Sequence, residues 1–427
     1  MKIAFDQYKF TASKVSGVPV HIKKLPWANS WVEIRVLIHT GALNDPEGKE
    51  GVAHFFEHLP FNGTEKYPSF EILERISRQI FMNSLNAYTS FAKTVFEGKV
   101  LKENLSKGVE VLKEMVAHPL LLPDEIERER GVITQEIWGR LNNPKKEKLF
   151  KDINKQLYRE NIYGRQVFAF GWSDTVAKVT KEDIVAFHRN HYHTGNIELI
   201  FTGDISMAEA KKVAKEFLVG IPKTAQNIKK IKAESFEAPE NRLLKISAKD
   251  FFGLNEDSVP KQTEIHAFRL TKPMKNPAVW GTANSLIRQF IFETLRGKLG
   301  ATYSPRIGVE RNLGHDAWDL YIGIEPSKAD EAKKIIREIL DKVAYGAKEV
   351  RPRFEETQRM RLEHLIAMET TASNIADNAT DDLSHFAPIK TVTEAIKERE
   401  AVTFKQVCDL VRNELSEDKL FWFIQEP

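Results

Sequence analysis

The alternation of hydrophobic and polar positions predicts that strands and helices are interleaved from the start of the chain. Residues 18–22 and 31–39 alternate or run apolar with many β-branched side chains, which predicts two strands. A polar turn at 44–48 follows, and then a helix that ends near Pro60. Ser69 is placed to cap a second helix, and residues 86–99 predict another strand.

Helical periodicity dominates the next part of the chain. Apolar residues recur every three or four positions over 101–116, which predicts an amphipathic helix, and Pro123 begins a long helix that continues past Trp138. Thr180 and Asp183 have the spacing of a capping box for a helix that reaches 191. A strand at 197–202 and a helix at 207–218 complete this half.

The second half of the chain has a similar order of elements. Strands are predicted at 264–270, 303–309, 317–324 and 420–424, and helices at 283–295, 329–345, 354–368 and 403–414. Residues 222–241 are polar, Lys-rich and without either periodicity, which is typical of a linker. We therefore expect an N-terminal domain at 1–221, a linker at 222–241 and a C-terminal domain at 242–427.

Composition and charge narrow the possible functions. The 427 residues are 42% hydrophobic and 29% charged, as in ordinary globular proteins. The 63 basic and 60 acidic residues leave a net charge of +3, which gives no reason to expect a nucleic-acid or membrane partner. No apolar run approaches the ~20 residues of a membrane span. The single cysteine and the absence of a signal-peptide pattern in residues 1–10 lead us to expect a cytoplasmic protein.

The motif that most clearly predicts a catalytic site is H-x-x-E-H at residues 54–58. His54 and His58 are one helical turn apart, so two imidazoles project from one face of a helix and can bind one Zn²⁺. Glu57 is on nearly the same face and is positioned to act as general base on a water in the open position of the metal. Such a motif needs a third protein ligand from elsewhere in the chain.

A long helix downstream offers that ligand. Glu129 and Glu136 are seven residues apart, about two turns, and so share a face. Glu136 is our candidate third ligand, and Glu129 our candidate for a second carboxylate that orients a ligand or tunes the water. The alternatives are a chance motif, expected in roughly a few per cent of chains this long, and a pair of ordinary surface glutamates.

The context of the motif resembles the pitrilysin family of zinc peptidases, which includes mitochondrial processing peptidase and insulin-degrading enzyme. That family has a glycine-rich approach, H-x-x-E-H, a G-T-x-x-Y-P run, an N-A-x-T strand, an E-x6-E helix, and an Arg and a Tyr seven residues apart. The matching residues here are Thr40–Ala42, Gly51–His58, Gly63–Pro68, Asn86–Thr89, Glu129 with Glu136, and Arg296 with Tyr303.

The resemblance implies a fold and an activity. The fold would be α+β, with two similar α/β-sandwich domains, each a mixed, mostly antiparallel sheet with helices packed on it. The activity would be that of a zinc metalloendopeptidase with one zinc per chain, hydrolysing short or unfolded peptides in an enclosed chamber. Rivals are a non-catalytic structural subunit of the same fold, which tends to lose the zinc motif, and a processing peptidase that removes leader segments.

The resemblance also implies how the substrate is held. Asn86 and Ala87 begin the strand to which a substrate adds as an extra strand, although the entry to it, residues 80–84, lacks the glycines usual in relatives. Arg296 and Tyr303 would grip the substrate main chain and support the tetrahedral intermediate. Judged by spacing alone, the same two residues fit a surface arginine and a core tyrosine.

Assembly follows from the number of domains. Family members build one chamber from four such domains, and this chain holds two, so we expect a homodimer, with a heterodimer with an inactive paralogue as the alternative. His188, His191 and His193 also cluster in the sequence. Their spacing does not fit one helical face, and we expect solvent-facing or hydrogen-bonded histidines there rather than a second metal site.

Overall fold

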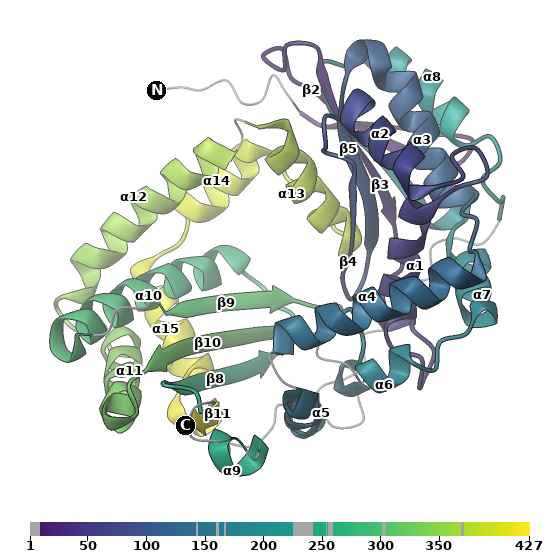
Figure 1. Ribbon diagram of the computed structural model, residues 1–427. Helices are drawn as coiled ribbons and strands as arrows, with labels where there is room; N and C mark the ends of the chain where they lie inside the picture. Colours follow the sequence, from purple (N-terminus) through teal and green to yellow (C-terminus); the bar gives the residue numbers. More distant parts are fainter. Residues whose placement is uncertain are drawn as a thin grey trace. The chain divides into compact units, whose positions relative to one another are not determined.

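The computed structural model describes residues 9–141, 144–158, 162–165, 168–224, 242–252, 254, 259–300, 305–368 and 371–427. The chain forms two compact units (Figure 1). The first consists of Met1–Asn154, Ile162–Ile231 and Ala367–Thr393, and the second of Lys155–Asn161, Lys232–Ile366 and Glu394–Pro427. The predicted domains differ from these units chiefly at residues 367–393, and most of the predicted linker, 225–241, lies outside the described residues.

The first unit is built on a six-stranded mixed sheet in the order β1-β2-β6-β3-β5-β4. Its strands are β1 (Thr11–Val15), β2 (Val18–Lys24), β3 (Trp31–Ile38), β4 (Asn86–Thr89), β5 (Thr94–Leu101) and β6 (Ile197–Gly203). Only β2 and β6 pair in parallel. The predicted single strand over 86–99 is wrong, because Ser90 N–H donates to the Lys93 carbonyl and closes a turn between β4 and β5.

Helices cover one face of this sheet. They include α1 (Val52–His58), α2 (Phe70–Ile80), α3 (Leu105–Ala117), α4 (Pro123–Leu141), α7 (Lys181–His191) and α8 (Met207–Phe217), while α5 (Pro144–Tyr158) and α6 (Ser173–Val176) lie between α4 and α7 in sequence. Alternate residues of β3, Val32, Ile34, Val36 and Ile38, join the main core. The predicted caps are confirmed, since Ser69 accepts from Ile72 N–H and Thr180 from Asp183 N–H.

A helix from late in the sequence, α13 (Ala372–Ser384), covers the other face of the same sheet (Figure 1). Leu37 and Ile200 pack there with Ala379. Buried Arg35 of β3 donates to Asp377 at 3.3 Å. Both faces of β3 are thus covered, which explains why its burial is nearly continuous instead of alternating.

The second unit has a five-stranded sheet in the order β7-β11-β8-β10-β9. Its strands are β7 (Arg242–Ser247), β8 (Thr263–Thr271), β9 (Arg306–Arg311), β10 (Asp316–Ile324) and β11 (Phe421–Glu426), with only β7 and β11 parallel. Its helices are α9 (Ala248–Phe252), α10 (Pro277–Leu299), α11 (Ala329–Ala344), α12 (Val350–Met368), α14 (Val392–Glu400) and α15 (Phe404–Glu414). Both units are mixed, mostly antiparallel sheets with packed helices, so the predicted α+β fold class is confirmed.

Several predicted elements have other boundaries in the structure, and two of them bear on the second unit's site residues. The helix expected at 283–295 begins six residues earlier, because Asn276 accepts from Val279 N–H as its cap and Pro277 fills its first turn. The strand expected at 303–309 is observed at Arg306–Arg311.

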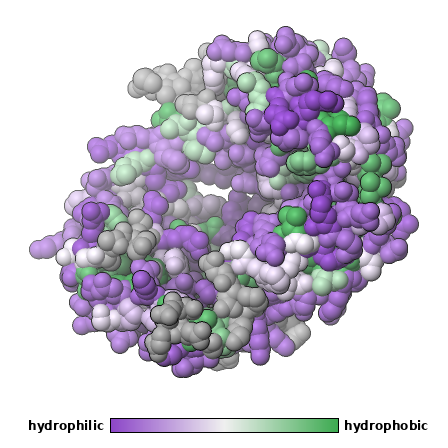
Figure 2. All heavy atoms as spheres, viewed as in Figure 1, coloured by the Kyte–Doolittle hydropathy of each residue, from purple (hydrophilic) through white to green (hydrophobic). Residues whose placement is uncertain are grey.

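The face shown in Figure 2 is predominantly hydrophilic, with hydrophobic side chains scattered over it. Among the described residues, no helix is both long and apolar enough to cross a bilayer.

Candidate metal and catalytic site

The helix α1 that carries the motif is held by its apolar side chains. It has seven residues, too few to be stable by helix propensity alone. Phe55 and Phe56 are fully buried, and the Phe56 ring stacks on His188 at 4.7 Å between centroids. These two anchors fix the rotation of α1 about its axis and so the direction in which His54 and His58 project.

A buried carboxyl group holds the beginning of α1. Asp45 accepts from the N–H groups of Gly51 at 2.7 Å and Ala53 at 2.9 Å, which otherwise lack partners at a helix start. Complete burial raises the pKa of Asp45 to about 8, although these two hydrogen bonds oppose the shift. Gly51 has φ +101°, and a Cβ there would lie 2.6 Å from the Phe170 carbonyl oxygen. Sequence reasoning missed Asp45, because six residues separate it from the helix end that it caps.

Helix α4 presents the two glutamates. Ile126, Ile133 and Ile137 are buried in the core of the first unit and fix this helix against it. Glu129 and Glu136 then lie together on a neighbouring stripe, as their seven-residue spacing predicts.

The donor atoms of three side chains converge. The Nε2 atoms of His54 and His58 are 3.2 Å apart, and Glu136 Oε2 is 3.6 Å from the first and 3.8 Å from the second. All three ligand atoms lie within 4.8 Å of one another, in the single group of this kind among the described residues. Two imidazole nitrogens and one carboxylate oxygen match a catalytic zinc site, which keeps its fourth position open.

A second set of contacts orients these ligands. Arg140 donates to Glu136 Oε1 at 2.8 Å, which leaves Oε2 to face the histidines. The His58 Nδ1 atom is 3.1 Å from Glu129 Oε2, so its Nε2 is directed to the shared point. Burial favours a higher pKa for Glu129, but hydrogen bonds from His58 and Asn62 outweigh it and lower the pKa. Arg140 was not predicted; it is one turn beyond Glu136, the spacing of a helical ion pair.

Burial also sets the protonation of the histidines. It lowers the pKa of His54 to about 3, with His58 and Arg140 adding to the effect, so His54 is neutral at pH 7. Burial alone would also lower the pKa of His58. The hydrogen bond to Glu129 and the charges of Glu57 and Glu136 outweigh burial, so the pKa of His58 is raised overall. A neutral imidazole is the form that binds a metal.

Glu57 lies beside this cluster and is 7% exposed. Burial raises its pKa to about 7, partly opposed by the charge of His58 and by hydrogen bonds from Thr89. A carboxylate in that range both accepts and releases protons near neutral pH. Thr89, the last residue of the N-A-x-T match, ends β4 and so links the base to the strand proposed to hold substrate.

The predicted substrate strand is an edge strand. Among the described residues β4 pairs only with β5, and it contacts α1. Asn86 is exposed and donates to Glu97 Oε1 at 3.3 Å, and Ala87 is 8% exposed. The strand therefore leaves one row of main-chain groups available beside the motif helix.

The predicted Arg/Tyr pair is described in part. Arg296 is exposed in the last turn of α10, in the second unit, with its guanidinium 5.7 Å from the Phe292 ring centroid. Tyr303 lies outside the described residues. In the histidine cluster near 190, His188 Nε2 is 2.8 Å from the Val116 carbonyl oxygen, a hydrogen bond of the kind expected there.

Comparison with known families agrees with this arrangement. The family model described as insulinase (peptidase family M16) matches residues 27–169, and the one described as the peptidase M16 inactive domain matches residues 178–351. This chain belongs to peptidase family M16, the pitrilysin family. The first match contains the histidine and glutamate cluster, and the second contains Arg296 and Tyr303.

Individual relatives support the same assignment. An uncharacterised zinc protease of Rickettsia felis is 29% identical over 46% of this chain and 46% of its own length, so the match spans about half of each protein. A protease from Helicobacter pylori has a TM-score of 0.83 at 18% identity, covering 98% of this chain and 100% of that one. The periplasmic protease PqqL from Escherichia coli has a TM-score of 0.77 at 19% identity, covering 98% of this chain and 47% of that one. The two structural likenesses show the shared fold.

Proposed function

We propose that this protein is a zinc-dependent metalloendopeptidase, with one zinc per chain held by His54, His58 and Glu136. The observation that carries the proposal is the convergence of their three donor atoms within 4.8 Å on two helices that other contacts hold in place. The zinc proteases among its relatives support the same class of activity.

The chemistry follows from the residues around the cluster. Zinc, when bound, is a Lewis acid that lowers the pKa of water and polarises a peptide carbonyl. Glu57 takes the proton of the attacking water on its carboxylate and passes it to the leaving amine. Glu129 holds the imidazole of His58 in one tautomer through the 3.1 Å contact at Nδ1.

Substrate binding is assigned to two further features. An extended peptide adds to the open edge of β4 at Asn86 and Ala87, where main-chain hydrogen bonds supply affinity with little demand on sequence. Short or unfolded peptides meet that requirement, because their backbone groups are free to pair. Arg296 and Tyr303 are proposed to grip the substrate main chain and to donate to the developing oxyanion.

The assembly proposed is a homodimer with an enclosed chamber, and a heterodimer with an inactive paralogue is the alternative. Family resemblance supports this proposal, since this chain covers 47% of the longer protease PqqL. A cytoplasmic location also remains a prediction, and PqqL itself is described as periplasmic.

Two other functions compete. A structural subunit of the same fold has no use for the metal set, which this chain retains with Glu57 and the orienting contacts of Glu129 and Arg140. A leader-peptide processing peptidase uses the same chemistry and differs in substrate, so activity on an unstructured peptide without a basic leader separates it from the proposal.

The test combines metal content with hydrolysis of an unstructured peptide. We expect one zinc per chain, activity that a chelator removes and zinc restores, and a Glu57→Gln variant that keeps zinc but loses hydrolysis by roughly 10²–10⁴-fold. Glu65→Gln, at an exposed glutamate near the motif, is the matched control and should remain active.

The metal ligands are tested separately. His58→Ala should lose most of its zinc, whereas His364→Ala, at an exposed histidine of α12, should retain it. Unchanged zinc content in His58→Ala would exclude the ligand set, and wild-type hydrolysis by Glu57→Gln would exclude the proposed base.

A further inference from the structure

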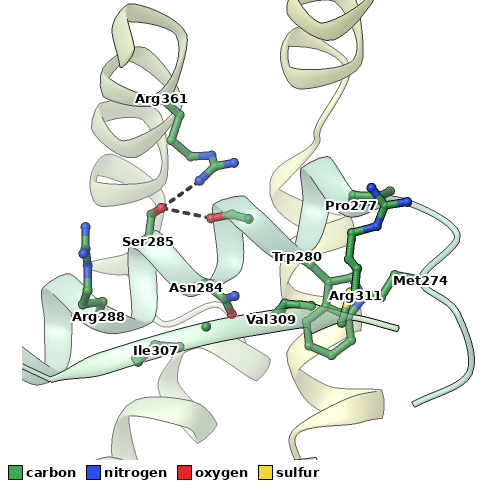
Figure 3. Close-up of a pocket in the computed structure, with 12 residues that line it drawn as sticks. Met274, Pro277, Trp280, Asn284, Ser285, Arg288, Ile307, Val309, Arg311 and Arg361 are labelled. Carbon is green, nitrogen blue, oxygen red and sulfur yellow. Dashed lines mark hydrogen bonds between the residues drawn. The ribbon is translucent and has the colours of Figure 1, made fainter. Parts of the chain in front are cut away.

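The second unit contains a pocket that the proposed peptidase chemistry does not use. It has a volume of about 360 Å³ and lies between α10, β9 and α12 (Figure 3). Its lining combines arginines with an apolar wall: Met274, Pro277, Trp280, Gly281, Asn284, Ser285, Arg288, Ile307, Gly308, Val309, Arg311 and Arg361. Three arginines and no carboxylate stand among these twelve residues.

The three arginines come from three different elements. Arg288 belongs to α10, Arg311 to the end of the edge strand β9, and Arg361 to α12 (Figure 3). Like charges that line one cavity disfavour one another's charged form.

Arg361 is hydrogen-bonded to a side chain of the pocket wall. Its Nη1 donates to Ser285 Oγ at 2.9 Å, and that hydroxyl donates in turn to the Gly281 carbonyl at 2.9 Å (Figure 3). Its Nε is buried without a hydrogen-bond partner among the described residues. Burial, together with the charges of Arg399 and Arg288, lowers the pKa of Arg361 to about 10. A neighbouring anion would offset the repulsion between these charges.

Gly281 makes this position of Arg361 possible. A Cβ at residue 281 would lie 2.2 Å from Arg361 Nη2. Glycine inside a helix is less favourable than alanine. The glycine therefore serves the close approach of the guanidinium to α10, and a methyl group there would push the arginine out of its place.

The opposite wall of the pocket is apolar. Trp280 is 5% exposed, and Ile307 and Val309 point from β9 to the same side of the sheet as Arg311. Asn284 adds a polar group: its Oδ1 accepts from Trp318 Nε1 at 2.9 Å, which identifies the other end of the amide as a donor. The pocket thus combines arginine and amide donors with aromatic and aliphatic surface.

We infer that this pocket binds a small organic anion in which a carboxylate, held by Arg361, is attached to an apolar group that packs on Trp280 and Val309, while Arg288 and Arg311 add positive charge at the two ends of the pocket. Arginine forms two parallel hydrogen bonds to a carboxylate, which suits the paired donors of Arg361. Phosphate shares the charge but lacks the apolar group, and so should bind more weakly.

The test uses two probes that differ only in charge. N-acetyl-L-phenylalanine and N-acetyl-L-phenylalaninamide are titrated into the full chain by calorimetry, with inorganic phosphate as a third ligand. We expect the acid to bind at least roughly tenfold more tightly than the amide or phosphate, since a hydrogen bond to a charged group is stronger than one to a neutral group. Arg361→Gln and Gly281→Ala should each weaken binding of the acid by roughly tenfold or more.

The matched control is Arg359→Gln. Arg359 is on the same helix, is 72% exposed and pairs only loosely with Glu363 at 3.9 Å, so its loss should leave binding unchanged. Equal binding of acid and amide, no measurable binding of the acid, or an equal loss in Arg359→Gln would overturn the proposal. If Arg361→Gln does not fold, Arg288→Gln, at an exposed position, gives the same comparison. Phosphate binding as tight as that of the acid would refute the claim that an apolar group of the ligand packs on this pocket.

Discussion

His58 and Glu129 are joined by a 3.1 Å contact between Nδ1 and Oε2 that connects the motif helix to α4. This contact orients the imidazole so that its two nitrogens face different partners. Nδ1 faces the carboxylate, and Nε2 faces His54 and Glu136. Glu129 thus directs a candidate ligand without being close enough to the shared point to count among the three ligands.

Removing that carboxylate should weaken metal binding without abolishing it. We expect Glu129→Ala to lower zinc affinity by roughly 10–100-fold, because loss of an outer partner leaves the imidazole free to rotate and less basic. Competition with a chromogenic chelator measures the change. Glu127→Ala, on the same helix with a side chain 68% exposed, is the control. Equal affinities in the two variants would contradict the orienting role.

Asp45 should stabilise the first unit through the start of α1. We expect Asp45→Ala to lower the free energy of unfolding by about 1–2 kcal/mol, as the loss of a helix cap does, because two buried N–H groups lose their acceptor. Denaturant titration measures it, with the exposed neighbour Glu47→Ala as control. An unchanged midpoint for Asp45→Ala would mean that the cap is dispensable.

The charge of Glu198 should make the free energy of unfolding depend on pH in the acidic range. It lies between His21 at 2.6 Å and His39 at 2.9 Å. Burial favours a higher pKa for Glu198, but these contacts outweigh it and lower the pKa from 4.5 to about 2. The carboxylate therefore stabilises the fold above pH ~4.5, and that contribution is lost as pH falls towards 2.

The measurement compares the wild type with Glu198→Gln. Their difference in free energy of unfolding should shrink by roughly 3 kcal/mol in total as pH falls from about 5 to 2, the equivalent of this pKa shift. Glu216→Gln, at an exposed glutamate, should show no such trend. A difference that stays constant with pH would show that the charge of Glu198 does not contribute.

The proposed dimer predicts complementation between two inactive variants. Glu57→Gln lacks the base, and a chain with Arg296→Ala and Tyr303→Phe lacks the substrate pair. If each site draws the base from one chain and the pair from the other, a mixed dimer has one intact site. Random exchange makes half the dimers mixed, so activity should recover to about a quarter of the wild-type value.

The control for complementation is a mixture of Glu57→Gln and His58→Ala. Both variants are defective in the same half of the site, so no mixed site is intact and activity should stay low. No recovery in the first mixture, with subunit exchange shown by mass spectrometry, would mean that the pair acts within its own chain or does not act.

The sequence by itself determined the elements whose signal is local. The spacing of His54 and His58 and that of Glu129 and Glu136 each define one face of a helix, because 3.6 residues per turn brings such positions together. The strands at Val18 and Trp31 and the two capped helices followed in the same way from periodicity and capping chemistry, whereas the α+β class was expected from the resemblance of the motifs to a known family.

Only the tertiary structure decided which faces meet. The packing of Phe55 and Phe56 against the core, and of Ile133 on α4, places Glu136 Oε2 3.6 Å from His54 Nε2. The cap by Asp45 and the placement of α13 on the first sheet depend on contacts between residues far apart in the chain. Local periodicity carries no information about such pairs, since burial and hydrogen bonding select them only once the chain is compact.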